Sequence, residues 1–158
     1  IKDSNQATPD VIESAPTTEE TISEPSEYEV MRTNAIAKKN RATQTRLEKV
    51  LSYTKQTMVA YMSEEDLNRL CTYVAEYSTE DTLQKISPVK VDSQLKSIDI
   101  MHFGWNIGKA FGRKRIHTAT FIKNVFAHTL CDVEISTIER KMSHTESKTK
   151  IHLNNQLV

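Results

Sequence analysis

The chain has 158 residues, of which 37% are hydrophobic and 27% are charged, and its 21 basic and 21 acidic residues give no formal net charge. With only three glycines and two cysteines, the composition excludes collagen-like and disulfide-rich proteins. No apolar run reaches the roughly 18 residues that a membrane-spanning helix needs. What remains is a small domain with a disordered extension.

The zero net charge conceals a strong segregation along the chain. Residues 1–30 carry a net charge of −7, residues 31–62 of +6, residues 63–100 of −4 and residues 101–158 of +5. The first segment also holds three of the four prolines. Such a segment cannot bury enough apolar surface to offset its chain entropy, so we expect residues 1–30 to be a disordered acidic tail or linker. An alternative is an acidic arm that shields a basic face of the same chain.

The two cysteines, Cys71 and Cys131, lie far apart in the sequence and in different predicted elements. They form no disulfide framework, which favours a reducing compartment and a cytoplasmic location. The first residues lack the charged and apolar regions of a signal peptide. Because Ile1 is not a start methionine, we expect the chain to be a piece of a longer protein.

Residues 31–92 are predicted to form a helical hairpin region. Residues 33–62 carry apolar side chains at helical intervals, namely Leu47, Val50, Leu51, Met58 and Tyr61. A second helix begins at Ser63, where Asp66 three residues later gives an acidic variant of the capping box. Its apolar stripe is formed by Leu67, Leu70, Cys71, Val74 and Tyr77. Residues 78–93 form a loop with one short helical turn.

A third helix is expected from Ser93 to Phe111. Gly104, Gly108 and Gly112 follow at intervals of four residues, which places them on one helical face. One interpretation is a groove where another helix approaches closely. The favoured interpretation is that Gly112 ends the helix, while the other two glycines relieve crowding beside Trp105.

The order of elements over residues 93–158 predicts a winged helix-turn-helix domain in a mainly α chain. Thr118 is expected to cap a fourth helix that ends near Leu130. The sequence Ser136-Thr137-Ile138-Glu139 is a capping box, so a fifth helix is expected from Thr137 to residue 147. Residues 150–158 then form a short C-terminal β-hairpin with a turn at Asn154-Asn155. In a winged helix the last helix enters the major groove of DNA.

The fifth helix carries a basic stripe, which makes double-stranded DNA the predicted partner. Arg and Lys side chains donate to guanine edges, and Thr side chains bond base edges or phosphates. The residues predicted at base edges and in the groove are Thr137, Arg140, Lys141 and His144. Those predicted to hold phosphates are Arg113, Lys114, Arg115, Lys123, Lys148 and Lys150.

The pattern of residues 95–153 resembles the C-terminal winged-helix half of RteC-type regulators, which control excision of conjugative mobile elements. The resemblance rests on Ile100-Met101-His102-Phe103 leading to Gly112, on Phe121-Ile122-Lys123-Asn124-Val125-Phe126 and on Ile138-Glu139-Arg140-Lys141. It implies a helical N-terminal half, a winged-helix C-terminal half and promoter DNA as the ligand. The function it implies is transcriptional regulation of a mobile genetic element.

Two other kinds of function stay open. A helical interaction or oligomerisation module would use the apolar stripes and the Gly104 and Gly108 face, with the basic faces merely solvated. RNA binding is less favoured, because clustered aromatic stacking residues are lacking. Catalytic glycine-rich motifs are missing, and no pair of histidines has the spacing of a helical zinc site. We therefore expect a non-enzyme without metal or cofactor and without a membrane partner.

Overall fold

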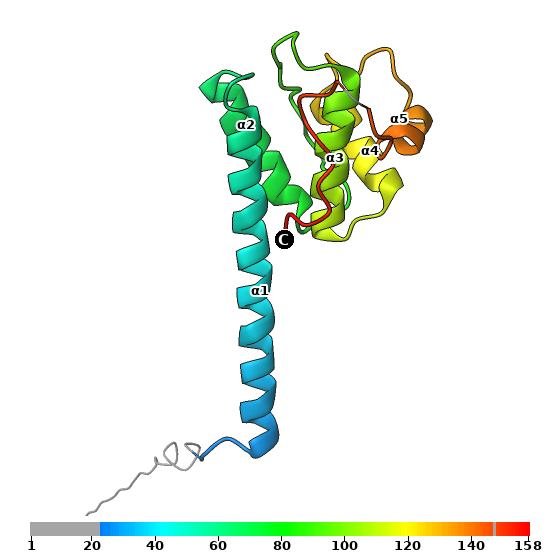
Figure 1. Cartoon of the computed structure of the whole chain (residues 1–158). Helices are drawn as coiled ribbons and strands as arrows, with labels where there is room; N and C mark the ends of the chain where they lie inside the picture. Colours follow the sequence, from blue (N-terminus) through cyan, green and yellow to red (C-terminus); the bar gives the residue numbers. More distant parts are fainter. Residues whose placement is uncertain (1–22, 147) are drawn as a thin grey trace, which may run out of the picture. The chain divides into compact units, whose positions relative to one another are not determined.

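The computed structural model describes residues 23–146 and 148–158. These residues form five helices, α1 (Glu27–Met58), α2 (Glu64–Tyr77), α3 (Ser97–Phe111), α4 (Arg115–Val125) and α5 (Ile135–Lys141), as Figure 1 shows. The expected mainly α class is therefore confirmed. Among the described residues, no helix is both long and apolar enough to cross a bilayer. The chain divides into two units, residues 1–40 and residues 41–158.

The described part of the first unit is a helical segment that starts inside the expected tail. Helix α1 begins at Glu27, because the Ser26 hydroxyl accepts a hydrogen bond from the Glu29 N–H at 3.1 Å. Glu27 and Glu29 also suit the positive end of the helix dipole. The expectation of disorder is thus wrong for residues 27–30, and its part over residues 1–22 lies outside the described residues.

The second unit contains the core, and α1 contributes to it from residue 41 onward. Val50, Thr54 and Met58 follow at intervals of four residues and are fully buried. Tyr53 stacks on Phe103 of α3, with ring centroids 5.9 Å apart. One face of this helical stretch therefore packs on the unit, as the apolar spacing predicts.

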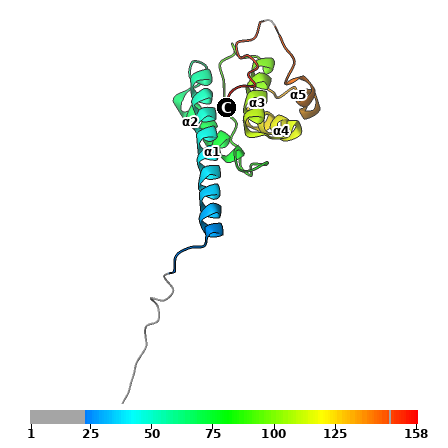
Figure 2. The ribbon, with the colours of Figure 1, turned by 60° about the horizontal axis from the view of Figure 1, so that its bottom comes forward.

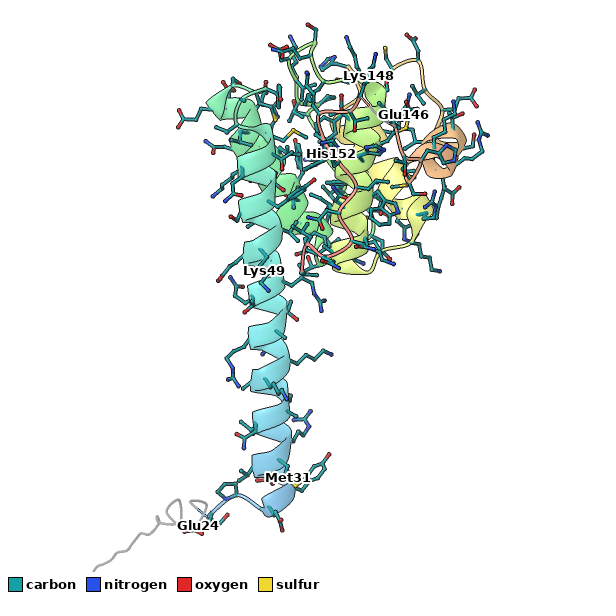
Figure 3. All side chains as sticks on the ribbon, viewed as in Figure 1. Glu24, Met31, Lys49, Glu146, Lys148 and His152 are labelled. Carbon is teal, nitrogen blue, oxygen red and sulfur yellow. The ribbon has the colours of Figure 1, made fainter. Side chains whose placement is uncertain are left out.

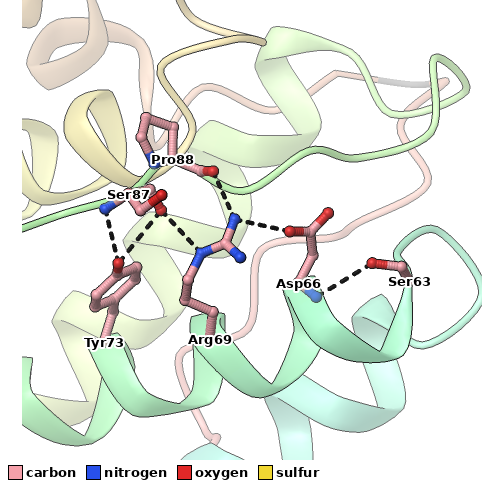
Figure 4. Close-up of polar contacts among 6 residues, drawn as sticks. All are labelled: Ser63, Asp66, Arg69, Tyr73, Ser87 and Pro88. Carbon is pink, nitrogen blue, oxygen red and sulfur yellow. Dashed lines mark hydrogen bonds and ion pairs between the residues drawn. The ribbon is translucent and has the colours of Figure 1, made fainter.

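Helix α2 starts where the sequence predicts. The Ser63 hydroxyl accepts a hydrogen bond from the Asp66 N–H at 3.2 Å, which caps the helix. Figure 4 shows how α2 also holds the loop that follows it. The Arg69 guanidinium donates to Asp66 Oδ1 and to the Pro88 carbonyl, both at 2.8 Å. The Tyr73 hydroxyl accepts from the Ser87 N–H at 2.7 Å. These bonds fix residues 87–88. The short helical turn expected within residues 78–93 does not form.

Helices α3, α4 and α5 lie side by side in both views of Figures 1 and 2. The glycines of α3 explain how closely α4 approaches. A Cβ at Gly104 would lie 2.7 Å from Ile122 Cγ2, and one at Gly108 would clash with Thr118. The two glycines therefore admit a neighbouring helix of the same chain, and the favoured interpretation of relieved crowding beside Trp105 is wrong for them. Gly112 ends α3 as expected, with a φ of 68°.

The predicted starts of α4 and α5 are both late. Thr118 does not cap α4, because α4 begins at Arg115 and Thr118 is buried one turn into the helix. Its hydroxyl instead lies 2.9 Å from the Tyr77 hydroxyl. Helix α5 begins at Ile135 rather than Thr137, because Ile135 and Ile138 both pack against the core.

The expected β-hairpin of residues 150–158 is wrong, since no strand forms among the described residues. Residues 148–158, here called the C-terminal strap, instead run along α3 (red in Figure 1). The polar side chains of α3 bind the strap backbone and take the place of a partner strand. Ile151, which is 3% exposed, anchors the strap in the core.

Candidate functional site

Basic side chains gather at the junction of α3 and α4. The turn between the helices is short, because Gly112 adopts the left-handed conformation and α4 starts at Arg115. Four cations therefore stand close together in the chain, and we call them the basic corner: Lys109, Arg113, Lys114 and Arg115. The Lys114 side chain makes no capping bond at the start of α4, where helix N–H groups favour anions.

Arg113 is the most constrained member of the basic corner. Its guanidinium donates to the Asp81 carboxylate and lies over the Tyr77 ring, 5.5 Å from the ring centroid. His117 Nδ1 also lies 3.9 Å from that carboxylate. The buried Arg113 Nε has no hydrogen-bond partner in the described part of the chain. The predicted phosphate-binding role of Arg113 therefore competes with an existing ion pair.

Arg115 connects the basic corner to α5. Its guanidinium donates to Ser143 Oγ at 3.0 Å and to the Glu139 carbonyl oxygen. Both partners are neutral acceptors, so the positive charge of Arg115 is not compensated by them. The contact places the start of α4 against the last turn of α5, which carries the exposed Arg140.

The predicted basic stripe on the fifth helix does not form as one face. Helix α5 ends at Lys141, and its C-cap residue Met142 is buried in the core at 1% exposure. Consequently His144 and Lys148 lie beyond the helix, and Figure 3 shows Lys148 near Glu146 at one end of the second unit.

Thr137 and Lys141 have an acidic environment. They line a pocket of about 530 Å³ together with three residues that carry carboxylates, Asp132, Glu134 and Glu146. A DNA phosphate would be repelled by these carboxylates. Arg140, which is predicted to act together with Thr137 and Lys141, does not line this pocket.

Lys123, predicted to bind phosphate, caps a loop instead. Its ammonium group donates to the carbonyl oxygens of Leu130 at 2.6 Å and Val133 at 2.7 Å, and lies 3.3 Å from that of Cys131. An ammonium group has three protons, so these contacts occupy its donors. The prediction overlooked the carbonyl groups that become unpaired after a helix end.

The three α3 residues that bind the strap were not among the site residues predicted from the sequence. Asp99, His102 and Asn106 share one face of α3, and each is at most 2% exposed. Asp99 Oδ1 accepts the N–H groups of Lys150 at 2.7 Å and Ile151 at 3.1 Å. Lys150 is therefore positioned through its backbone, while its side chain stays exposed.

Asn106 and His102 also form hydrogen bonds with the backbone of the strap. The Asn106 amide donates to the His152 carbonyl at 2.8 Å and accepts the Asn154 N–H at 2.6 Å. The two ring nitrogens of His102 face the carbonyls of Ile151 at 2.8 Å and His144 at 2.6 Å. Carbonyl oxygens only accept, so both contacts are hydrogen bonds when both nitrogens carry a proton. The sequence signal was three polar residues at helical spacing within an apolar helix.

Two groups outside the basic corner have perturbed acidity. Burial raises the pKa of the Tyr53 hydroxyl, while hydrogen bonds from Asn106 and Thr57 oppose the shift. Burial likewise raises the pKa of the Cys71 thiol, against the opposing charge of Lys55. A raised thiol pKa lowers reactivity, in keeping with a packing role for Cys71. No cluster of three metal-binding side chains occurs within residues 23–146 and 148–158.

Comparison of the chain with protein-family models, with curated proteins and with solved structures gives no match. The functional assignment therefore depends on the residues and their geometry.

Proposed function

We propose that the chain is a DNA-binding regulatory protein of the cytoplasm. Helices α3, α4 and α5 would act as its helix-turn-helix module. The resemblance of residues 95–153 to RteC-type regulators supports this role and suggests the promoter DNA of a mobile genetic element as the ligand. The observation that carries the proposal is the contact of Arg115 with Glu139 and Ser143, which joins the basic corner to the last turn of α5.

The basic corner supplies the chemistry that DNA binding requires. Lys109, Lys114 and Arg115 have exposed side chains. Lysine and arginine contacts to phosphates give affinity and orient a protein on the duplex. Arg140, on the adjoining turn of α5, would then supply a base contact, because a guanidinium donates to guanine O6 and N7.

The geometry changes which residues we assign to DNA. Thr137 and Lys141 lie among carboxylates, and the Lys123 ammonium is engaged by carbonyls, so we leave them out of the proposed contact surface. The connection between α4 and α5 spans nine residues, from 126 to 134. This is longer than the three or four residues of the common helix-turn-helix motif, so the angle at which α5 meets the groove would differ.

The test is fluorescence anisotropy of the full chain with a mixed pool of duplex DNA over a series of salt concentrations. We expect binding that weakens steeply as salt rises, because each phosphate contact releases counterions. The double variant Lys114→Gln with Arg140→Gln should bind more weakly and reduce the logarithmic salt slope by about 1 for the lost phosphate contact.

The matched control is Lys85→Gln with Lys90→Gln, which removes two exposed charges from the loop after α2. It should bind as the parent chain does. Equal loss in both double variants would show that only net charge matters. Absence of binding at low salt would reject the proposal.

A second candidate, a protein-interaction module, is favoured by the first unit. The helical residues 27–40 expose four large apolar side chains, Tyr28, Val30, Met31 and Ile36. Exposed apolar residues in such number on one short segment are typical of contact with a partner or a second copy. Sedimentation at several concentrations tests this role. A mass that rises with concentration and falls in the variant Tyr28→Ser with Met31→Ser would support it, and a constant monomer mass would reject self-association.

A further inference from the structure

A pocket of about 380 Å³ lies beside the basic corner. The second half of α3, the start of α4 and the residues after α5 form its wall. We call it the Trp105 pocket, and its polar or aromatic lining residues are Trp105, Lys109, Arg113, Arg115, Thr118 and Ser143. Three of its lining residues are cations and none carries a carboxylate. The lining therefore favours an anionic group.

The cations of the Trp105 pocket retain donors for a ligand. Arg115 is held by two neutral oxygens, those of Ser143 and Glu139, which orient the guanidinium without cancelling its charge. Arg113 is paired with Asp81 and its Nε is buried, so it is the least accessible of the three cations. A phosphate group has several acceptor oxygens and suits guanidinium groups that are already oriented.

The aromatic lining of the pocket indicates a second property of the ligand, in addition to its negative charge. Trp105 is partly buried and is, with Met142, one of the two large apolar residues that line the pocket. An indole ring stacks on planar aromatic ligands. A ligand that matches both sides carries a phosphate and an aromatic ring in one small molecule.

We propose that the Trp105 pocket binds a free mononucleotide. Its phosphate would contact Lys109, Arg113 and Arg115, and its base would lie against Trp105. The volume lies in the lower part of the range of about 300–1,000 Å³ that small-molecule sites occupy, which fits a mononucleotide better than a larger cofactor. This inference does not depend on the proposed DNA binding, although Lys109 and Arg115 belong to both surfaces.

The chain offers a direct readout, because Trp105 is its only tryptophan. Adenosine monophosphate is titrated into the full chain while Trp emission is recorded, with excitation at the red edge where nucleotides do not absorb. We expect saturable quenching with a Kd in the micromolar to low millimolar range. Adenosine should bind at least about tenfold more weakly, because it lacks the charged hydrogen-bond acceptor. Inorganic phosphate should compete with the nucleotide.

The variant Lys109→Gln should weaken nucleotide binding about tenfold, since it removes one charged partner from an exposed position. The control Lys90→Gln should leave the affinity unchanged. Three results would overturn the proposal: no change in emission or in calorimetric heat, adenosine binding as tightly as its monophosphate, or equal loss in both variants.

A parallel titration with duplex DNA distinguishes failure of the pocket assignment from failure of the proposed DNA binding. Nucleotide binding that persists in a chain unable to bind DNA would leave the Trp105 pocket assignment intact and reject only the DNA-binding role. DNA binding without any response to the nucleotide would reject the pocket assignment alone.

Discussion

The hydroxyl groups of Tyr77 and Thr118 lie 2.9 Å apart in the core, where they join α2 to α4. The same tyrosine ring stacks on Phe121 at a centroid distance of 4.3 Å and carries the Arg113 guanidinium on its face. One buried residue thus links the packing of α2 and α4 to the basic corner.

Replacing Tyr77 by Phe keeps the ring and removes this hydrogen bond. We expect Tyr77→Phe to lower the free energy of unfolding by about 1 kcal/mol at neutral pH, as measured by urea denaturation. An unchanged denaturation midpoint would show that the bond contributes nothing.

The same tyrosine should make stability sensitive to alkali. Burial raises the pKa of Tyr77, and Asp81 adds to the shift, while the Thr118 hydrogen bond and Arg113 oppose it. Above about pH 10 the unfolded chain loses the phenolic proton while the folded chain retains it. The stability present below that pH is therefore lost as pH rises through the folded pKa. Denaturation midpoints over an alkaline series should fall less steeply for Tyr77→Phe than for the parent chain.

Because α3 and α4 approach closely, we expect a Gly→Ala substitution in α3 to destabilise the protein, although such a substitution usually stabilises a helix. Gly→Ala within a helix usually stabilises it by up to about 1 kcal/mol. At Gly108 the new Cβ would clash with Thr118, whose Cγ2 would lie only 2.9 Å away, so Gly108→Ala should destabilise by about 1–3 kcal/mol. In a Thr118→Ala background the cost should shrink, because the clashing atoms are gone. Equal costs in both backgrounds, measured by denaturation, would contradict this packing.

The structural role of Lys123 can be tested by removing its ammonium group while keeping the aliphatic part of the side chain. Lys123→Met keeps the apolar stem but leaves the carbonyls of Leu130 and Val133 without their donor. We expect a loss of about 1–3 kcal/mol in thermal or chemical unfolding. The exposed Lys114, replaced in the same way, should change stability by less than about 0.5 kcal/mol. Similar small effects at both positions would show that the loop does not need Lys123.

The strap should become accessible when its side-chain partners are removed. Asp99→Asn places an amide N–H opposite a backbone N–H of Lys96, Lys150 or Ile151, all of which now donate to the carboxylate. We expect trypsin to cleave after Lys148 and Lys150 about tenfold faster, as local opening becomes easier. The exposed Asp92, replaced by Asn, is the matched control. Unchanged cleavage in Asp99→Asn would mean that the Asp99 carboxylate is not needed to hold the strap.

Local sequence patterns predicted the helices better than they predicted the helix ends. The stripe of α2 and the cap at Ser63 were recognisable because both are local, and the buried Leu70, Val74 and Tyr77 confirm them. The start of α1 was also encoded locally, since Ser26 and Glu29 have the spacing of a capping box. The acidic, proline-rich composition around them concealed this signal.

The errors arose where distant contacts decide. Thr118 has a capping side chain, but its contact with Tyr77 lies 41 residues away in sequence and places it inside α4. Residues 150–153 alternate as a strand does, yet their polar partners are three side chains of α3 rather than a second strand. The cations of the candidate site were visible in the sequence. Their carbonyl and carboxylate partners were not, because those come from other elements.

The strap is hydrogen-bonded to α3 through side chains, so we expect its amide hydrogen exchange to differ from that of the helices. The amide protons of Lys150, Ile151 and Asn154 are held by Asp99 and Asn106 instead of by a backbone ladder. Their exchange with solvent deuterium therefore requires only that the strap lifts from α3, while amides in the middle of α3 exchange through larger openings. These three protons are thus natural reporters of whether strap and helix separate as one step before the core unfolds.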